Sequence, residues 1–139
     1  MKPTDLQIGD YTLVKPSMML IKIAAVHNKK VGYHAVTNKL NWVRIDLLEP
    51  IPLTQSILEV NGFKVDGYAN LNLQDGKWLE YYFHEHRFSM YYEGIDEWQN
   101  HSQVRDIVHR SQPFYVHELQ HCLRLCCLNE LADNLKLEG

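Results

Sequence analysis

The stretch Met18-Met19-Leu20-Ile21-Lys22-Ile23-Ala24-Ala25-Val26, followed by the polar segment His27-Asn28-Lys29-Lys30 and the run from Val31 to Val36, decides the fold. Both outer runs carry the β-branched, aromatic and other apolar residues that favour strands. The four polar residues between them are typical of a turn. The stretch therefore predicts two neighbouring antiparallel strands.

Strand signals continue on both sides of this hairpin, at Tyr11–Val14 and at Trp42–Leu47. Four or five short strands within residues 6–53 predict an SH3-like small β-barrel. Pro50 and Pro52 then interrupt regular pairing, because proline cannot donate to a strand ladder. We therefore expect an N-terminal barrel over residues 1–53 and an α+β subdomain over residues 54–139.

The second part begins with a short helix and continues as a meander. Thr54 is the predicted N-cap of a helix over residues 55–61. Three strands follow and form an antiparallel β-meander with a turn at Asp75-Gly76: Tyr68–Leu73, Lys77–Phe83 and Phe88–Tyr92. The fold class expected for the whole chain is α+β.

The last third of the chain predicts one amphipathic helix. Residues 95–112 have no clear pattern and hold either a helical turn around residues 104–108 or a loop. Ser111 then caps the C-terminal helix, with Pro113 in its first turn. Residues 129–133 either end that helix or form a second short one. Residues at helical spacing define its expected buried stripe: Val116, Leu119, Leu123, Cys126 and Cys127.

Composition excludes several classes of protein. The 139 residues are 45% hydrophobic and 22% charged, which is ordinary for a globular fold, and the net charge of −3 gives no support for a bulk nucleic-acid binder. No run of 18 apolar residues exists, and residues 1–5 lack the apolar core of a signal peptide. Three cysteines clustered within residues 122–127 fit a reducing compartment. We therefore expect a cytoplasmic protein.

The segment His117-Glu118-Leu119-Gln120-His121 spells H-E-x-x-H, the helical signature of zinc metallopeptidases. Residues i and i+4 share a helix face, so His117 and His121 could bind one zinc ion while Glu118 acts as general base. In the longer metzincin pattern the third ligand falls at Cys127 and a glycine at position 124, which here is Arg124. We therefore favour a structural role for this segment.

A zinc site would need a third protein ligand. Glu130 follows too closely, and Asp133 and Glu138 are weak candidates. His84 and His86, spaced i and i+2, point to one face if their strand continues through them, and could complete a site with the helix. We favour the interpretation that these two residues form a polar hairpin tip. We expect no cofactor, unless the H-E-x-x-H segment is a metal site, in which case the cofactor is zinc.

Two further patterns bear on binding. Aromatic residues gather between Trp78 and Tyr92, which predicts a sheet covered on both faces and leaves open whether one face carries a partner. In the first 50 residues basic side chains outnumber acidic ones, which raises weak nucleic-acid binding through the barrel as an alternative. Within residues 15–44 the basic residues are Lys15, Lys22, Lys29, Lys30, Lys39 and Arg44.

Three segments together resemble a group of small uncharacterised proteins of gut-bacterial genomes, their phages and mobile elements. They are Leu6–Tyr11, then Leu48–Thr54 with Ile57-Leu58 and Asn61-Gly62-Phe63, and Tyr115–Gln120. Similar proteins carry H-x-L-Q-N, so the resemblance implies that His121 completes H-E-x-x-H by chance, and that residues 95–112 are an insertion. The resemblance implies an accessory protein. It implies no activity for this chain, because the similar proteins are uncharacterised.

The function expected from the sequence is a non-enzymatic binding or interaction module with a protein partner. A zinc-dependent hydrolase using residues 117–121 is the first alternative, and weak nucleic-acid binding through the N-terminal barrel is the second.

Overall fold

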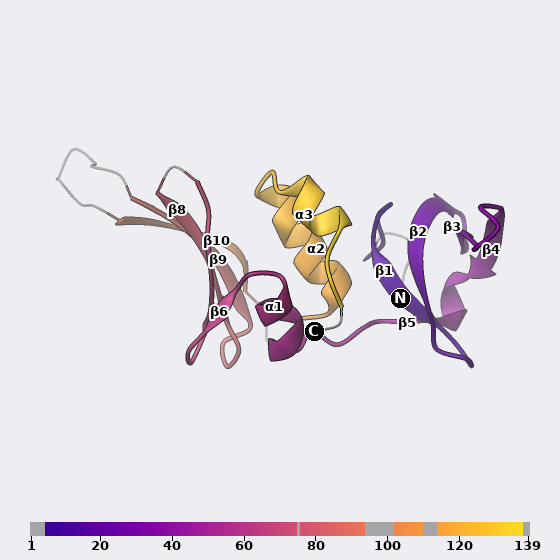
Figure 1. The fold of residues 1–139 in the computed structure, drawn as a ribbon, viewed down its shortest axis with the longest axis horizontal. Helices are drawn as coiled ribbons and strands as arrows, with labels where there is room; N and C mark the ends of the chain where they lie inside the picture. The colour runs from indigo at the N-terminus through magenta and orange to yellow at the C-terminus, as the bar shows by residue number, and fades with distance from the viewer. Residues whose placement is uncertain (1–4, 75, 94–101, 110–113, 138–139) are drawn as a thin grey trace. The chain divides into compact units, whose positions relative to one another are not determined.

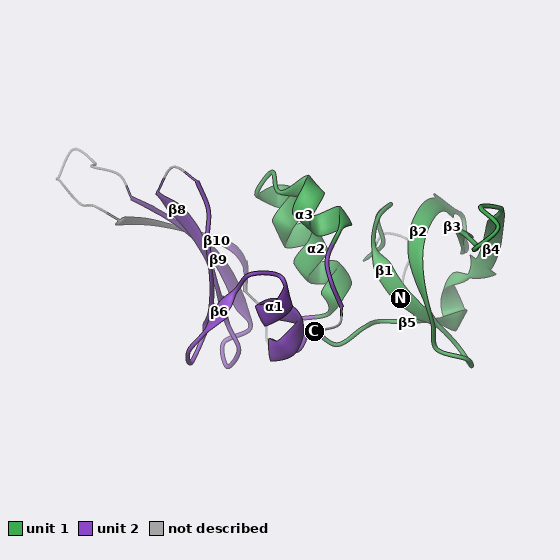
Figure 2. Ribbon diagram, viewed as in Figure 1, with its two compact units in different colours: residues 1–52, 115–134 green, residues 53–114, 135–139 purple. Residues whose placement is uncertain are grey.

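The computed structural model describes residues 5–74, 76–93, 102–109 and 114–137 (Figure 1). The chain divides into two compact units (Figure 2): residues 1–52 with 115–134, and residues 53–114 with 135–139. The division expected from the sequence, 1–53 and 54–139, separates the chain after the same proline-rich segment but leaves the last helices with the second part. In the structure these helices belong to the first unit.

The first unit contains an antiparallel sheet, whose described strands lie in the order β4-β3-β2-β1-β5. The strands are β1 (Tyr11–Val14), β2 (Met19–His27), β3 (Lys30–His34), β4 (Leu40–Arg44) and β5 (Leu48–Glu49), with the 3₁₀ helix η2 (Ile45–Leu47) before β5. The hairpin predicted from residues 18–36 is β2 and β3, with Val26 opposite Val31. Among the described residues this sheet is open, since no ladder joins β4 to β5.

Alternation along these strands builds the core of the sheet. Successive side chains point to opposite faces of a strand, so every second residue enters the core. The buried members are Leu6, Val14, Ile21, Ile23, Val31, Ile45 and Leu48. The opposite faces of β3 and β4 carry exposed side chains.

Two helices complete the first unit: α2 (Val116–Leu125) and α3 (Asn129–Asp133). The predicted caps Ser111 and Pro113 lie outside the described residues, and α2 begins at Val116 with Tyr115 as its N-cap. Val116, Leu119 and Leu123 are buried as predicted.

Cys126 and Cys127 do not continue the buried stripe of α2, although their helical spacing predicts that they would. The helix ends at Leu125, and the chain turns at Cys127, which has a φ of 62°. Cys126 is therefore half-buried and Cys127 exposed. Gln120 and Cys122 are buried on α2 instead.

The second unit contains helix α1 and a second antiparallel sheet. Its elements are α1 (Gln55–Val60), β6 (Lys64–Val65), β7 (Ala69–Asn72), β8 (Lys77–Tyr82), β9 (Arg87–Glu93) and β10 (Ser102–His109). The described strands lie in sequence order, β10-β9-β8-β7-β6. The hydroxyl of Thr54 accepts a hydrogen bond from the backbone N–H of Ile57, which confirms the predicted cap.

The helical turn or loop expected around residues 104–108 is wrong, because these residues lie in strand β10, which pairs antiparallel with β9. The pairing satisfies the backbone of a segment whose own sequence carries no clear strand signal. The remainder of the predicted loop, residues 95–101 and 110–112, lies outside the described residues.

Aromatic residues of the sheet in the second unit lie on both faces of β8, since Trp78 and Tyr82 alternate with Tyr81 along the strand. Tyr81 and Phe88 are buried on one face.

None of the described helices is long and apolar enough to cross a membrane.

Candidate functional site

The H-E-x-x-H segment forms the first turns of α2, and the structure brings its two histidines together. The ring centroids of His117 and His121 are 5.6 Å apart, with an angle of 74° between the ring planes. The spacing of four residues therefore places both imidazoles on neighbouring turns of one face, as the sequence predicts.

Glu118 interacts with the start of its own helix. Its carboxylate accepts a hydrogen bond of 2.9 Å from the backbone N–H of Tyr115, the N-cap residue. A negative charge in the first turn is also stabilised by the helix dipole. Glu118 thus performs the capping that a glutamate at this position performs in many helices.

His121 and Arg124 share a buried carboxylate to which the sequence does not draw attention. Asp10 has no solvent exposure. Its Oδ2 lies 2.7 Å from Nε2 of His121 and accepts a bond of 2.8 Å from the backbone N–H of Gln7. Its Oδ1 accepts a bond of 2.7 Å from Nη1 of Arg124, whose Nη2 also lies 3.2 Å from Asp133. A buried carboxylate needs such partners to remain charged.

Gln120, also without solvent exposure, connects three backbone groups. Its Nε2 donates bonds of 2.8 Å to the carbonyls of Gly9 and Ala132, and its Oε1 accepts a bond of 2.9 Å from the N–H of Tyr11. The loop before β1 is thereby joined to helices α2 and α3. We use the name Asp10 cluster for the residues Asp10, Gln120, His121, Arg124 and Asp133.

Gly9 makes the close approach of loop and helix possible. Its φ is +96°, and a Cβ atom there would lie 2.7 Å from Oδ1 of Asp133 and 2.8 Å from Nη2 of Arg124. A side chain at this position would therefore disrupt the Asp10 cluster as well as strain the backbone. The segments Leu6–Tyr11 and Tyr115–Gln120, which share in the resemblance described above, are partners in this packing.

His117 is 5% exposed and stacks on Tyr115, with 6.0 Å between ring centroids. Burial lowers the pKa of its imidazole below the ordinary value of 6.5, although the nearby carboxylates of Glu118 and Asp10 partly offset this effect. Its Nδ1 has no hydrogen-bond partner among the described residues. Burial therefore favours the neutral form of the His117 ring.

The other predicted metal ligands lie in several parts of the chain. His84 and His86 lie between β8 and β9 in the second unit, and Cys127 is exposed beyond the end of α2. Glu138 lies outside the described residues. In the part of the chain that the structure describes, no three His, Cys, Asp or Glu side chains are arranged to hold a metal ion.

Sequence reasoning misses Asp10 and Gln120, and it considers Asp133 only as a weak metal ligand. One signal is available for Gln120, because it lies four residues after Val116 and three before Leu123, within the apolar stripe of α2. A polar residue in such a stripe has partners inside the protein. Asp10 offers no comparable signal, since its side-chain partners on α2 follow more than 100 residues later.

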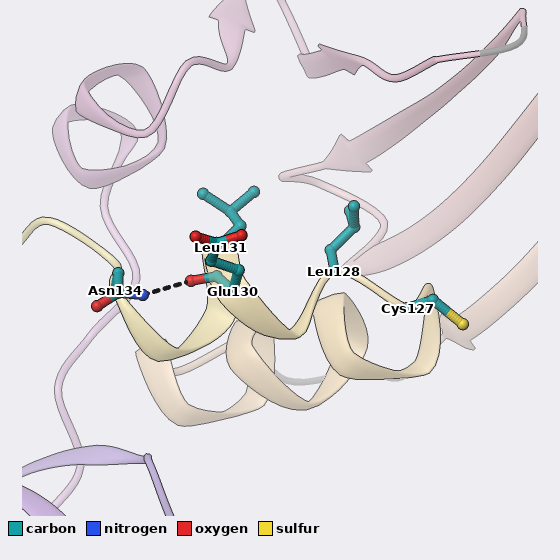
Figure 3. Close-up of a pocket in the computed structure, with 5 residues that line it drawn as sticks. All are labelled: Cys127, Leu128, Glu130, Leu131 and Asn134. Atoms are coloured by element: carbon teal, nitrogen blue, oxygen red, sulfur yellow. Dashed lines mark hydrogen bonds between the residues drawn. The ribbon is translucent and has the colours of Figure 1, made fainter.

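A shallow hollow of about 580 Å³ lies where α2 turns into α3 (Figure 3). Its described lining is Cys127, Leu128, Glu130, Leu131 and Asn134, and the side-chain amide of Asn134 donates to the carbonyl of Glu130. Glu130 is the one charged residue among these five. The described lining therefore has no set of polar groups that converge on a ligand.

In the second unit, one sheet face pairs aromatic rings around the buried carboxylate of Glu80. Trp78 stacks on Tyr91 with centroids 5.5 Å apart, and Tyr68 stacks on Tyr82 at 5.3 Å. Glu80 accepts hydrogen bonds from the indole of Trp78 and the hydroxyl of Tyr82. The polar groups of this face thus bond to one another.

In the first unit, an outward sheet face is centred on Trp42, which is 47% exposed. The register places Lys30 opposite Arg44, Gly32 opposite Trp42, and His34 opposite Leu40. The ring of His27 lies edge-on to Trp42, with centroids 6.5 Å apart. We use the name Trp42 face for the residues His27, Lys30, His34, Leu40, Trp42 and Arg44.

Comparison of the chain with protein-family models, with curated proteins and with solved structures finds no match.

Proposed function

We propose that this protein is a non-enzymatic, cytoplasmic binding module, an accessory protein of phage or mobile-element type, in which the H-E-x-x-H helix has a structural role. The observation that carries the proposal is the bonding of Asp10 by His121, Arg124 and the backbone of Gln7. His121 and Arg124 thereby hold helix and loop together, and Glu118 caps α2.

The order of elements in the first unit supports an SH3-like small barrel as the binding scaffold. Four strands form a meander, a 3₁₀ helix follows, and β5 returns to pair with β1, with Val14 opposite Leu48. SH3-like barrels connect their strands in this order. Folds of this type host many functions, so the site decides what is bound.

The Trp42 face supplies the binding surface. Large aromatic side chains contribute much of the binding energy at interfaces when they are exposed in the free protein and buried in the complex. Trp42 and Leu40 are exposed on the same face of β4, at 47% and 38%. A partner that covers them would remove a contiguous apolar area from water.

Retention from a bacterial lysate tests this function and identifies the partner in the same experiment. Immobilised protein and its Trp42→Ala variant are compared, with Trp78→Ala, a tryptophan of the other unit, as the control. We expect a macromolecule that is retained by the wild type and by the control and lost from Trp42→Ala. Equal retention on all three would contradict the proposal.

A zinc-dependent hydrolase is the second candidate, and one observation favours it. His117 is neutral, as a metal ligand must be, and its Nδ1 is unused, while a carboxylate beside His121 is the usual companion of a metal-ligating histidine. His117 and His121 would be ligands and Glu118 the base, with a third ligand still required.

Mass spectrometry of protein purified without a histidine tag or chelator separates the two candidates. The structural role predicts no stoichiometric zinc, and a Glu118→Gln variant that loses at most about 1 kcal/mol, because a side-chain amide oxygen can still accept from Tyr115 and only the charge at the helix N-terminus is lost. About one zinc per chain, lost in His117→Ala, would establish a metal site instead.

A further inference from the structure

We propose that the Trp42 face binds single-stranded nucleic acid, with the Trp42 indole stacking on a base and the surrounding lysines and Arg44 contacting phosphates. This inference rests on the proposed function and names the class of its ligand.

The first argument is the position of Trp42 on the sheet. Gly32 lies opposite it on β3, and a Cβ atom at Gly32 would lie 3.4 Å from Cζ3 of Trp42 and 3.1 Å from Cδ1 of Leu40. Because Gly32 has no side chain, the indole lies close over the backbone of β3. One side of the ring system is thereby supported by the sheet, and the rest is accessible to a partner.

The second argument is charge. Lys30 and Arg44 lie on the Trp42 face, and Lys29 and Lys39 lie at its two ends, in the turns before β3 and before β4. These four side chains are exposed. None of the described strand positions that make up this face carries a carboxylate, and Asp46, which pairs with Arg44, lies just beyond the end of β4.

The structure also accounts for most of the acidic residues that offset the basic ones in the N-terminal sequence. Asp10 is buried and paired with Arg124, and Glu49 pairs with Lys15 at 3.2 Å. Lys22 is directed to the backbone carbonyl of Asp133. Asp46 likewise pairs with Arg44, so the exposed lysines around Trp42 that have no ion pair among the described residues are Lys29, Lys30 and Lys39.

A hollow beside Trp42 offers room for a phosphate or sugar. It has a volume of about 430 Å³ and is lined by His27, Asn28, Lys29 and Lys30. The ring of His27 lines this hollow and also contacts Trp42, 6.5 Å from the indole centroid. An aromatic ring flanked by a basic hollow matches the way proteins bind single strands, by stacking on bases and following the backbone with cations.

A single strand is favoured over a duplex. Bases in a duplex are already stacked on one another and present only their edges, so an indole lying on a sheet cannot stack on them. The face is also short, since β4 spans five residues, or about 16 Å at roughly 3.3 Å per residue. It suits a few nucleotides of an unpaired segment.

Fluorescence anisotropy with a fluorescein-labelled oligothymidylate of 12 nucleotides tests the proposal on the full-length protein. We expect binding at low salt that is weakened roughly 5- to 100-fold by Trp42→Ala, the range measured when a stacking aromatic is removed. Trp42→Phe should restore much of the affinity, because the smaller ring can still stack. The circular dichroism spectrum of each variant verifies folding.

The contribution of the lysines is tested by measuring how the affinity for the oligonucleotide depends on salt concentration. The double variant Lys29→Ala/Lys30→Ala should lower the slope of log K against log salt by about 1.4, since each phosphate contact on a single strand contributes about 0.7. The matched control is Lys64→Ala, an exposed lysine of β6 in the second unit, which should leave the affinity and the slope unchanged.

Three results would overturn the inference: no binding of the oligonucleotide at low salt, equal affinity of wild type and Trp42→Ala, or a duplex of equal length bound as tightly as the single strand. If the oligonucleotide fails while Trp42-dependent retention from a nuclease-treated lysate persists, the proposed binding function stands and its ligand is a protein.

Discussion

A fully buried carboxylate depends on charges supplied from inside the protein, and Asp10 obtains them from one helix. Arg124 neutralises it, His121 and the backbone of Gln7 bond to it, and the carboxylate is shielded from solvent. Removing one partner of a buried ion pair lowers the free energy of unfolding far more than removing one partner of an exposed ion pair. The reason is that the remaining charge stays buried without a counter-charge.

Replacing Asp10 by alanine should therefore destabilise the protein by about 3–5 kcal/mol, since Arg124 and His121 lose their shared partner. The change in free energy of unfolding can be measured by urea denaturation. The control is Asp46→Ala, which removes an exposed pair with Arg44 and should cost less than about 1 kcal/mol. Equal losses for the two variants would contradict the role assigned to Asp10.

His117 predicts a dependence of stability on pH. Burial lowers the pKa of this ring in the folded protein, whereas the unfolded chain takes up a proton near pH 6.5. As the pH falls below about 6.5, the unfolded state therefore binds more protons than the folded state, and stability decreases. The neutral His117 ring thus contributes its full stability above about pH 6.5, and this stability is lost as the pH falls towards the lowered pKa of the folded protein.

His117→Phe should accordingly lose less stability than the wild type between pH 7 and pH 5, because phenylalanine cannot be protonated and can still stack on Tyr115. Melting temperatures over this range provide the measurement. His34→Phe, at an exposed position of β3, should retain the wild-type pH dependence. An unchanged slope in His117→Phe would argue against a buried neutral ring.

At the scale of elements, α2 is attached through the amide of Gln120. Replacement of Gln120 by leucine preserves the size of the side chain but leaves the N–H of Tyr11 and the carbonyls of Gly9 and Ala132 without this partner. We expect a loss of at least about 1–3 kcal/mol, the cost of one buried polar group left unpaired. Urea denaturation measures the change. For the control Gln74→Leu, at an exposed position, the free energy of unfolding should change by no more than about 0.5 kcal/mol.

The elements themselves are largely predictable from the sequence, because their periodicity is local. Strand-forming residues identify β1 to β3, and helical spacing identifies the buried residues Val116, Leu119 and Leu123 of α2. The strand expected at Trp42–Leu47 is only partly correct, because β4 is Leu40–Arg44 and Ile45–Leu47 form the 3₁₀ helix η2. Strand β10 cannot be predicted in this way, because its residues have no clear strand pattern. It is a strand because its backbone pairs with β9.

The Asp10 cluster could not be predicted for a related reason. The H-E-x-x-H segment draws attention to His117 and His121, and their proximity follows from helix geometry. What His121 contacts depends on Asp10, which lies 111 residues earlier in the chain. Local spacing contains no information on such a pairing, so only the folded chain connects the two residues.

At the scale of the molecule, the second unit is inserted into the first. The two ends of the first unit that border residues 53–114 lie together, since Pro52 bridges to Tyr115 and the carbonyl of Ile51 accepts a bond of 2.8 Å from the N–H of Val116. Insertions of this kind leave the host with its own core and its own hydrogen bonds.

A chain of residues 1–52 joined to residues 115–134 by a two-residue Asn-Gly turn should therefore fold without the inserted unit, because such a turn suits an antiparallel pair. Circular dichroism should show a cooperative thermal transition. In the same shortened chain Asp10→Ala should abolish that transition. A shortened chain that is unfolded even in the cold would show that the first unit depends on the residues removed, 53–114 and 135–139.

This interrupted connectivity has a consequence for synthesis on the ribosome. The loop that carries Asp10 is made first, whereas Arg124 follows 114 residues later. At about 5–20 residues per second, the nascent chain waits roughly 6 to 23 s for the cation that permits Asp10 to leave water. During that interval the N-terminal strands emerge without the helices that complete their unit, while residues 53–114 appear in one uninterrupted block. Residues 53–114 are therefore available to fold before the host is complete, whereas residues 135–139, whose Lys136 bonds to Asn61, join the second unit last. Translation speed thus sets how long the N-terminal strands wait for α2 and α3.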